Sequence, residues 1–229
     1  MWLLDRLLPP RCLLCDDPGV HGMPLCAGCL GECTRNDPAC SRCAEALPGT
    51  ADTLPDLTVC GACLWRPPPY TAIHAPYRYA APLDGLIHRL KFRGDLAAGR
   101  LLGLMLARAA GDRFRECNAI VPIPLHPRRL RTRGYNQAVE LARPLARHLG
   151  IPIRPDALVR GGSTRAQMEL PARERRANVR GAFRPGRPVT GRVLLVDDVI
   201  TTANTVGEAA RLLTANPDTE VVVYALARA

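Results

Sequence analysis

The chain has 229 residues, of which 47% are hydrophobic, enough for one substantial core and a small satellite domain. No apolar run approaches the roughly 20 residues that a membrane-spanning helix requires, so we expect no membrane span. The opening MWLLDRLLPP is too short for a signal peptide and contains Asp5 and Arg6, which predicts a cytoplasmic protein.

The net charge of +10 is unevenly distributed along the chain. Residues 120–192 contain 16 arginines and four acidic residues, so the rest of the chain is slightly acidic. This concentration of positive charge indicates an anionic ligand. Lys91 is the only lysine, which excludes the G-x-x-x-x-G-K-[ST] loop of P-loop ATPases, and no G-x-G-x-x-G opens a helix.

Eight of the ten cysteines form four C-x-x-C pairs near the amino terminus. In a cytoplasmic protein such pairs indicate metal rather than disulfides, because two pairs supply the four thiolates of one tetrahedral zinc ion. Sequential pairing predicts two zinc ribbons, while crossed pairing and a redox role stay open. The predicted ligands are Cys12, Cys15, Cys26, Cys29, Cys40, Cys43, Cys60 and Cys63.

The cysteine pairs predict a double zinc-ribbon domain over residues 1–66. This region has few apolar residues, so we expect zinc to supply most of its folding free energy. Cys33 and Cys117 stand outside the pattern. The run RPPP from Arg66 to Pro69 predicts a stiff linker, and residues 70–229 form the second predicted domain.

Strands and helices alternate in the second predicted domain. Strands are predicted over 72–79, 118–125, 151–159, 192–199 and 220–227, and helices over about 83–115, 136–150 and 202–213. Asn136 and Gly150 supply the start and stop signals of the middle helix, despite Pro144. The alternation predicts an α/β fold, in which helices cover both faces of a mainly parallel sheet. Ligands of such sheets bind at the carboxyl ends of the strands.

The stretch VLLVDDVITTANTV, from Val193 to Val206, carries the clearest chemical signal. An apolar strand is expected to stop at Asp197 and Asp198 and to turn through a threonine-rich loop into a helix. The backbone N–H groups and dipole of that helix would bind a phosphate, and Asn204 can cap it. Each carboxylate can accept a hydroxyl of a ribose, so the stretch predicts a sugar-phosphate site.

This stretch resembles the phosphoribosyl-pyrophosphate (PRPP) motif of type I phosphoribosyltransferases. Three further segments and the four cysteine pairs resemble the competence-protein-F (ComF) family, known for roles in DNA uptake, nearly end to end. The segments are LIHRLKFRGD (86–95), VPIPLHPRRLRTRGYNQA (121–138) and TRAQMELPARERRANVRGAF (164–183). The resemblance implies a type I phosphoribosyltransferase-like domain after the zinc ribbons.

By this resemblance, Asp197 and Asp198 bind the ribose hydroxyls and stabilise positive charge while pyrophosphate leaves. The loop around the 5-phosphate would comprise Thr201, Thr202, Ala203, Asn204 and Thr205. The pyrophosphate loop would follow the strand at 118–125 and offer Arg128, Arg129, Arg131 and Arg133. Residues 160–182 would form a flap, from which Arg165, a third candidate catalytic residue, and Gln167 could reach the leaving group. Magnesium would accompany PRPP, in addition to two structural zinc ions.

Three functions stay open at this point. The protein could transfer a phosphoribosyl group to an unidentified acceptor with release of pyrophosphate. It could instead bind single-stranded DNA without turnover, as a partner of a DNA-uptake helicase, or it could be a PRPP-sensing regulator. The arginines of 128–133 could instead be a solvated face or a nucleic-acid patch independent of PRPP. We expect His126 and His88 to be capping or surface residues, and Tyr135 either stacks on a base or packs under its loop.

Overall fold

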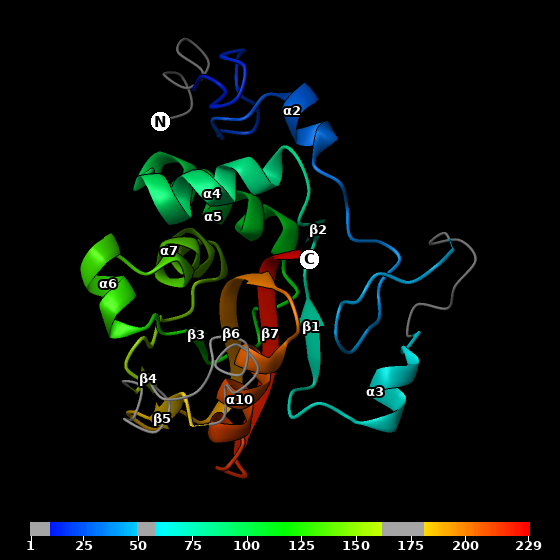
Figure 1. Ribbon diagram of the computed structural model, residues 1–229, viewed down its shortest axis with the longest axis vertical. Coiled ribbons are helices and arrows are strands. Elements are labelled where there is room, and N and C mark those ends of the chain that lie inside the picture. The colour runs from blue at the N-terminus through cyan, green and yellow to red at the C-terminus, as the bar shows by residue number, and fades with distance from the viewer. Residues whose placement is uncertain (1–9, 50–57, 162–180) are drawn as a thin grey trace, which may run out of the picture.

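The structure is a computed structural model that describes residues 10–49, 58–161 and 181–229. Its centre is a five-stranded sheet in the order β1–β7–β6–β3, with β2 also paired to β7 (Figure 1). The strands are β1 (Ala72–His74), β2 (Tyr77–Arg78), β3 (Ala119–Pro122), β6 (Gly191–Ile200) and β7 (Thr219–Arg228). Every pairing within this sheet is parallel, which confirms the predicted sheet type.

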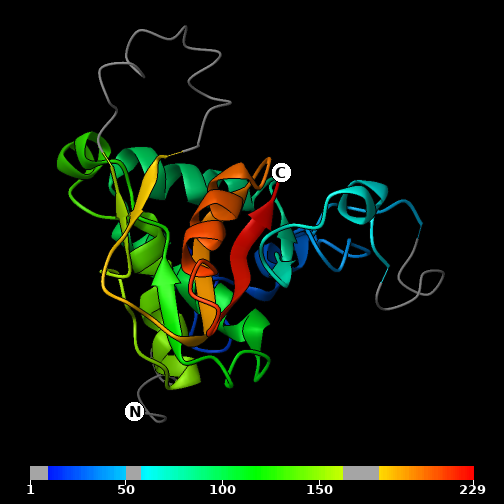
Figure 2. The same ribbon diagram turned by 90° about the horizontal axis from the view of Figure 1, so that it is seen from below.

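Helices cover both faces of the sheet (Figures 1 and 2). One face carries α4 (Leu83–Arg93), α5 (Leu96–Ala110) and α7 (Gln137–Leu149), and the other carries α10 (Asn204–Leu213). Side chains alternate along β6: Leu194 and Val196 join the core under α4, α5 and α7, whereas Val193 and Leu195 join the core under α10. The predicted α/β architecture is therefore confirmed.

The predicted helix over 83–115 is in fact two helices. Gly94 closes α4 in the left-handed region at φ 68°, a conformation that glycine adopts at little cost. Asp95 then caps α5, because its carboxylate accepts a hydrogen bond from the N–H of Ala98 at 2.9 Å. The predicted helix at 136–150 agrees with α7, which Asn136 caps and Gly150 ends at φ 75°.

The predicted strand over 151–159 is largely wrong. Only Ile153 reaches the sheet, through a single parallel bridge to Ile120. The chain then forms β4 (Leu158–Arg160), which pairs antiparallel with β5 (Phe183–Pro185) in a separate two-stranded sheet. Pro152 and Pro155 explain the difference, because proline has no N–H to donate to a ladder of hydrogen bonds. The strand predicted over 72–79 is likewise divided into β1 and β2.

The cysteine-rich region packs closely against the sheet and its helices. It contains two short helices, α2 (Ala27–Glu32) and α3 (Gly61–Trp65). Met23 and Leu25 are buried in the same core as α4 and α5, and the guanidinium of Arg89 donates to the carbonyl of Leu13 at 2.9 Å. Apolar packing thus adds to whatever free energy zinc supplies here. Among the described residues, no helix has the length and apolar character needed to cross a membrane.

Candidate functional site

The paired cysteines gather into two clusters of four sulfur atoms. Within each cluster the sulfurs lie within 4.8 Å of one another, and the sets are Cys12, Cys15, Cys26 and Cys29, then Cys40, Cys43, Cys60 and Cys63. The Sγ–Sγ distances are 3.5 Å for Cys15–Cys26 and 3.7 Å for Cys43–Cys60. Zinc with Zn–S bonds of about 2.3 Å would hold its sulfurs about 3.8 Å apart in a tetrahedron. Each cluster therefore fits one zinc ion, and the sequential pairing is confirmed.

The polypeptide around the clusters also fits bound metal. Backbone N–H groups of Cys60 and Arg42 point at the sulfur of Cys40, at 3.2 and 3.4 Å, and such donors favour a thiolate over a thiol. Cys33 and Cys117 belong to neither cluster and are buried. The thiol of Cys33 instead donates to the carbonyl of Cys29 at 3.4 Å.

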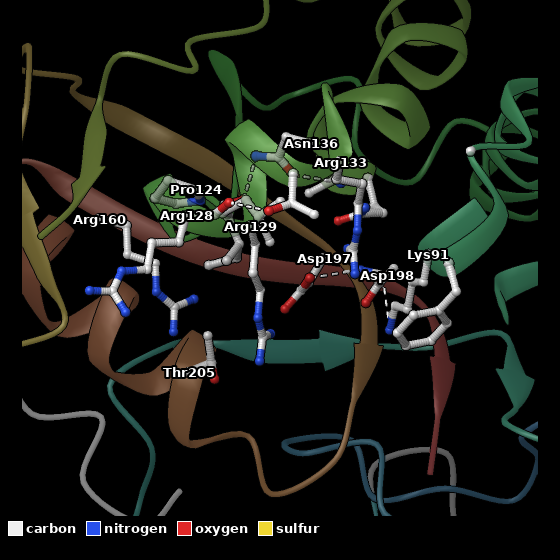
Figure 3. A pocket seen from close by; sticks show the side chains of 17 residues that line it. Lys91, Pro124, Arg128, Arg129, Arg133, Asn136, Arg160, Asp197, Asp198 and Thr205 are labelled. Atoms are coloured by element: carbon white, nitrogen blue, oxygen red, sulfur yellow. Dashed lines mark hydrogen bonds and ion pairs between the residues drawn. The ribbon is translucent and has the colours of Figure 1, made fainter. Parts of the chain in front are cut away.

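A cleft of about 780 Å³ lies at the carboxyl ends of β3 and β6 (Figure 3). Asp197 and Asp198 of β6 line it together with Thr205 of α10, and residues of α4 and of the segment after β3 form its other walls. β6 does not stop at the acid pair as predicted but continues to Ile200. The carboxylates consequently sit on a paired strand, which fixes their backbone more firmly than a turn would.

The two carboxylates occupy different surroundings. Asp198 is buried: one oxygen accepts the N–H of Val199 at 2.7 Å, and the other lies 3.0 Å from Nζ of Lys91. Asp197 is half-buried, and its Oδ1 accepts the N–H of Asp198 at 2.9 Å. Within the described residues its second oxygen has no partner. Asp197 is thus the member of the pair that is free to bind a ligand.

Burial and the neighbouring charge of Asp198 raise the pKa of Asp197 to about 7, although Lys91 and Arg160 oppose the shift. A carboxyl whose pKa is higher in the folded than in the unfolded protein destabilises the fold as it ionises. For Asp197 this loss develops between about pH 4, where the unfolded chain ionises, and about pH 7.

We therefore expect Asp197→Asn to stabilise the free protein at pH 8 by on the order of 2 kcal/mol, with little effect near pH 4. Thermal unfolding of both proteins between pH 4 and pH 8 measures this difference. Both proteins hold the same cysteine clusters, so pH effects on metal binding cancel in the comparison. An equal shift in Tm at every pH would contradict the raised pKa.

The predicted pyrophosphate loop contains a short helix, α6 (Pro127–Arg133). Pro127 starts it, Gly134 ends it at φ 82°, and the side chain of His126 caps it by accepting the N–H of Arg128 at 3.2 Å. With 3.6 residues per turn, a helix cannot turn all its arginines to one side. Arg128, Arg129 and Arg133 line the cleft, and Arg131 does not.

The predicted phosphate loop is only partly directed at the cleft. Thr205 lines it, whereas Thr202, Ala203 and Asn204 line a neighbouring hollow of about 710 Å³ beside the second cysteine cluster. Thr201 is exposed, and its carbonyl accepts from Arg228.

The expected capping role of Asn204 is not observed. Asn204 is the first helical residue of α10, and the N-cap is Ala203, at φ 58° and without a side-chain acceptor. No side chain of the described residues caps the first turn of α10, so its N–H groups suit an anion.

Two cationic residues of the cleft were not identified from the sequence. Lys91 arrives from the last turn of α4, and Arg160 from the end of β4 (Figure 3). The pKa of Arg160 is lowered by burial and by the nearby Arg129, while Asp197 opposes this shift. The sequence did offer a reason to consider Lys91 as a site residue, because it is the only lysine and lies within the segment LIHRLKFRGD.

The remaining sequence expectations concern the flap and Tyr135. Arg165 and Gln167 lie outside the described residues. The hydroxyl of Tyr135 donates to the carbonyl of Leu90, so this residue packs under its loop. Phe92 is 68% exposed, and the guanidinium of Arg133 lies 5.6 Å from its ring centre. Among the described residues that line the cleft, it is the one aromatic side chain.

Comparison with known proteins places the chain in a family. A family model described as "Double zinc ribbon domain" matches residues 3–64. The chain is 39% identical to the DNA utilization protein YhgH of Escherichia coli strain K12, and 36% identical to competence protein F of Haemophilus influenzae. Each match covers 96% of this chain and at least 97% of the relative. The chain belongs to the ComF family.

One solved structure similar to this ComF-family protein is the orotate phosphoribosyltransferase from Aeropyrum pernix. The similarity covers 58% of this chain and 60% of the other, with a TM-score of 0.37 and 18% identity. A similarity this low assigns no chemistry to the cleft.

Proposed function

We propose that this protein binds PRPP with magnesium and transfers the phosphoribosyl group to an acceptor with release of pyrophosphate. The observation that supports this most strongly is the composition of the cleft. Five cationic side chains surround two adjacent carboxyls beside an uncapped helix end. A sugar that carries phosphates at both ends matches these features, because its hydroxyls suit the carboxyls and its phosphates suit the cations.

Each part of PRPP has a place in this proposal. The 5-phosphate accepts N–H groups from the first turn of α10 and the hydroxyl of Thr205. The ribose hydroxyls donate to Asp197 and Asp198. Arg128, Arg129 and Arg160 hold the pyrophosphate. Arginine suits this task because its planar fork binds phosphate oxygens in pairs.

The same residues fit a magnesium ion bound together with PRPP. Magnesium keeps several waters and needs only one or two protein carboxylates, and Asp197 has an unpartnered oxygen to offer. The ion would neutralise part of the negative charge of the pyrophosphate. As the C1–O bond to pyrophosphate breaks and the acceptor attacks C1, the carboxylates stabilise positive charge on the ribose ring and the arginines stabilise the leaving group.

Calorimetric titration with PRPP, in the presence of magnesium, tests the binding step. An acceptor screen that measures released pyrophosphate then tests the transfer. Binding together with acceptor-dependent release supports the enzyme, and binding without release from any acceptor favours a PRPP-sensing regulator. Absence of PRPP binding would refute the proposal.

A second candidate function, binding of single-stranded nucleic acid, is favoured by a different surface. Two adjoining hollows of about 660 and 360 Å³ lie between the cysteine-rich region and the sheet. Four exposed arginines line them: Arg35, Arg42, Arg108 and Arg113. None of the four has a carboxylate at ion-pair distance within the described part of the chain. The guanidinium of Arg35 lies 4.9 Å from the ring centre of Tyr77.

Exposed arginines without carboxylate partners among the described residues suit a phosphate backbone, and their planar guanidinium groups can stack on bases. The names of the relatives, DNA utilization protein and competence protein F, agree with such a partner. None of these four arginines belongs to the basic stretch 120–192, of which residues 128–133 were left open as a nucleic-acid patch. Three arginines of that stretch, Arg128, Arg129 and Arg133, line the cleft instead.

We expect the triple variant Arg35→Ala, Arg108→Ala, Arg113→Ala to weaken binding of a labelled oligothymidylate at least tenfold at low salt. The log–log salt slope should decrease by about 0.7 for each lost phosphate contact. Fluorescence anisotropy measures both quantities. The matched control is Arg143→Ala with Arg147→Ala on α7, together with Arg211→Ala on α10, which removes three charges elsewhere. Equal losses in both triple variants would indicate nonspecific charge attraction and contradict a binding groove.

A further inference from the structure

Lys91 occupies the side of Asp198 that a ribose hydroxyl would need. Its Nζ lies 3.0 Å from Oδ2 of Asp198, whose other oxygen accepts the N–H of Val199 at 2.7 Å. The side chains of the pair are only 25% and 11% exposed, so water screens their attraction less than that of a surface pair. Both oxygens of Asp198 thus have a partner before any ligand arrives.

Lys91 is also the one cation of the described cleft lining that forms an ion pair. Within the residues that the structure describes, the four arginines of the lining have no carboxylate at ion-pair distance. These are Arg128, Arg129, Arg133 and Arg160. An entering anion therefore meets four guanidinium groups without ion-pair partners and one ammonium group that a carboxylate already holds.

We propose that Lys91 makes the cleft select sugars that carry a pyrophosphate over ribose 5-phosphate. This inference rests on the proposed function. A neutral ribose hydroxyl competes poorly with an ammonium group for a carboxylate, because charge-assisted hydrogen bonds are roughly twice as strong as neutral ones. A pyrophosphate offers the ammonium several anionic oxygens instead, and Asp198 is then released to accept the ribose.

The side chain of Lys91 is suited to such an exchange of partners. Its charge is a single compact group on a flexible four-carbon stem, whereas an arginine fork is tied to a fixed geometry. It lies on the last turn of α4, and Lys91, Phe92 and Gly94 all line the cleft. Lys91 thus strengthens the binding of PRPP and weakens the binding of ribose 5-phosphate, which also lacks a leaving group.

The test compares two ligands on the full-length protein. We expect Lys91→Met to weaken magnesium-dependent binding of PRPP about tenfold, the loss of one charge-assisted bond. Binding of ribose 5-phosphate should stay unchanged or become tighter, so the ratio of the two dissociation constants falls. Lys91→Arg should keep a preference for PRPP, since it keeps the charge. A parallel loss of affinity for both ligands in Lys91→Met would overturn the inference.

Because Lys91 is the only lysine, a second test needs no substitution. Protein labelled biosynthetically with carbon-13 lysine gives a single lysine side-chain signal in NMR spectra. We expect that signal to move when PRPP or pyrophosphate is added with magnesium, and to stay in place with ribose 5-phosphate. A shift of equal size with ribose 5-phosphate would contradict the exchange. If wild-type protein binds no PRPP at all, the proposed function itself fails, and this outcome differs from either result above.

Discussion

Replacing Asp197 and Asp198 together by asparagine is expected to weaken magnesium-dependent binding of PRPP by 100-fold or more while the fold persists. Asparagine keeps the shape of both side chains and can still accept the N–H of Val199 and of Asp198, so β6 should stay intact. What disappears is the negative charge that a magnesium ion and the ribose hydroxyls would use in the proposed function. Hydrogen bonds to charged groups contribute about 1.5–3 kcal/mol each, and two such losses reach this range.

The matched control removes two carboxylates outside the cleft. Asp84→Asn with Asp112→Asn changes the net charge by the same amount, and both residues are away from the cleft lining. Its affinity for PRPP should equal that of the wild type within about twofold, as expected for distant exposed charges. Wild-type affinity in the Asp197→Asn, Asp198→Asn protein, with Tm no lower, would refute the sugar-phosphate site.

The single replacements separate the two carboxylates. Within the described part of the chain, one oxygen of Asp197 has no partner, so Asp197→Asn should remove most of the affinity. Asp198→Asn also releases Lys91 from its ion pair, which frees the ammonium for the pyrophosphate and offsets part of the loss. We therefore expect Asp197→Asn to be the more damaging of the two, and the same calorimetric titrations measure this order.

The features that the sequence predicted well depend on short stretches of chain. A C-x-x-C turn places its two sulfurs on one metal whatever the rest of the chain does, and the sequential pairing was confirmed. The buried strand β6 and the helix α7 can also be recognised from their own residues alone. The first is a run of apolar residues, and the second carries its cap at Asn136 and its stop at Gly150.

The failures have two physical origins. One is local turn chemistry, which overrides the pattern of the surrounding sequence. Pro127 and Gly134 are typical start and stop residues of a helix, and α6 forms between them where a loop was expected. Pro152 and Pro155 likewise argue against a sheet strand. Both errors arose where a pattern at a larger scale outweighed the turn chemistry.

The other origin is contact between distant parts of the chain. Nothing near Lys91 in the sequence indicates that its ammonium meets Asp198, because the contact depends on how α4 packs on β6. The approach of Arg160 to the cleft has the same basis, since it follows from the pairing of β4 with β5. The acid pair and three arginines of the cleft, Arg128, Arg129 and Arg133, could thus be predicted from the sequence. The two cations that other elements contribute, Lys91 and Arg160, could be placed beside them only in the structure.

Loss of zinc from the first cysteine cluster is expected to destabilise the protein far more than loss from the second. Cys12 and Cys26 of the first cluster are buried in the core that includes α4 and α5, as are Met23 and Leu25. By contrast, Ala44 is the one buried residue that the second ribbon contributes to a described core cluster. The other links of the second ribbon to the sheet are polar. The N–H of Ile73 donates to the carbonyl of Arg42, and Glu45 forms an ion pair with Arg228 of β7.

We therefore expect Cys15→Ser to lower the free energy of unfolding by about 5 kcal/mol. This is a fraction of the roughly 10–16 kcal/mol that zinc supplies to finger peptides. Cys63→Ser should cost roughly 1–2 kcal/mol, because the sheet and helices keep their own core when the second ribbon loosens. Denaturant unfolding followed by circular dichroism gives both values. Metal analysis should find two zinc ions in the wild type and one in each variant.

Cys33→Ser is the matched control for this pair. It changes a cysteine of the same region that lies in neither cluster, so it should keep two zinc ions per chain. Fewer than two zinc ions in the wild type would refute the paired sites. Equal destabilisation by Cys15→Ser and Cys63→Ser would instead show that the second ribbon supports the core as strongly as the first. In that case the difference in buried packing between the ribbons would not govern stability.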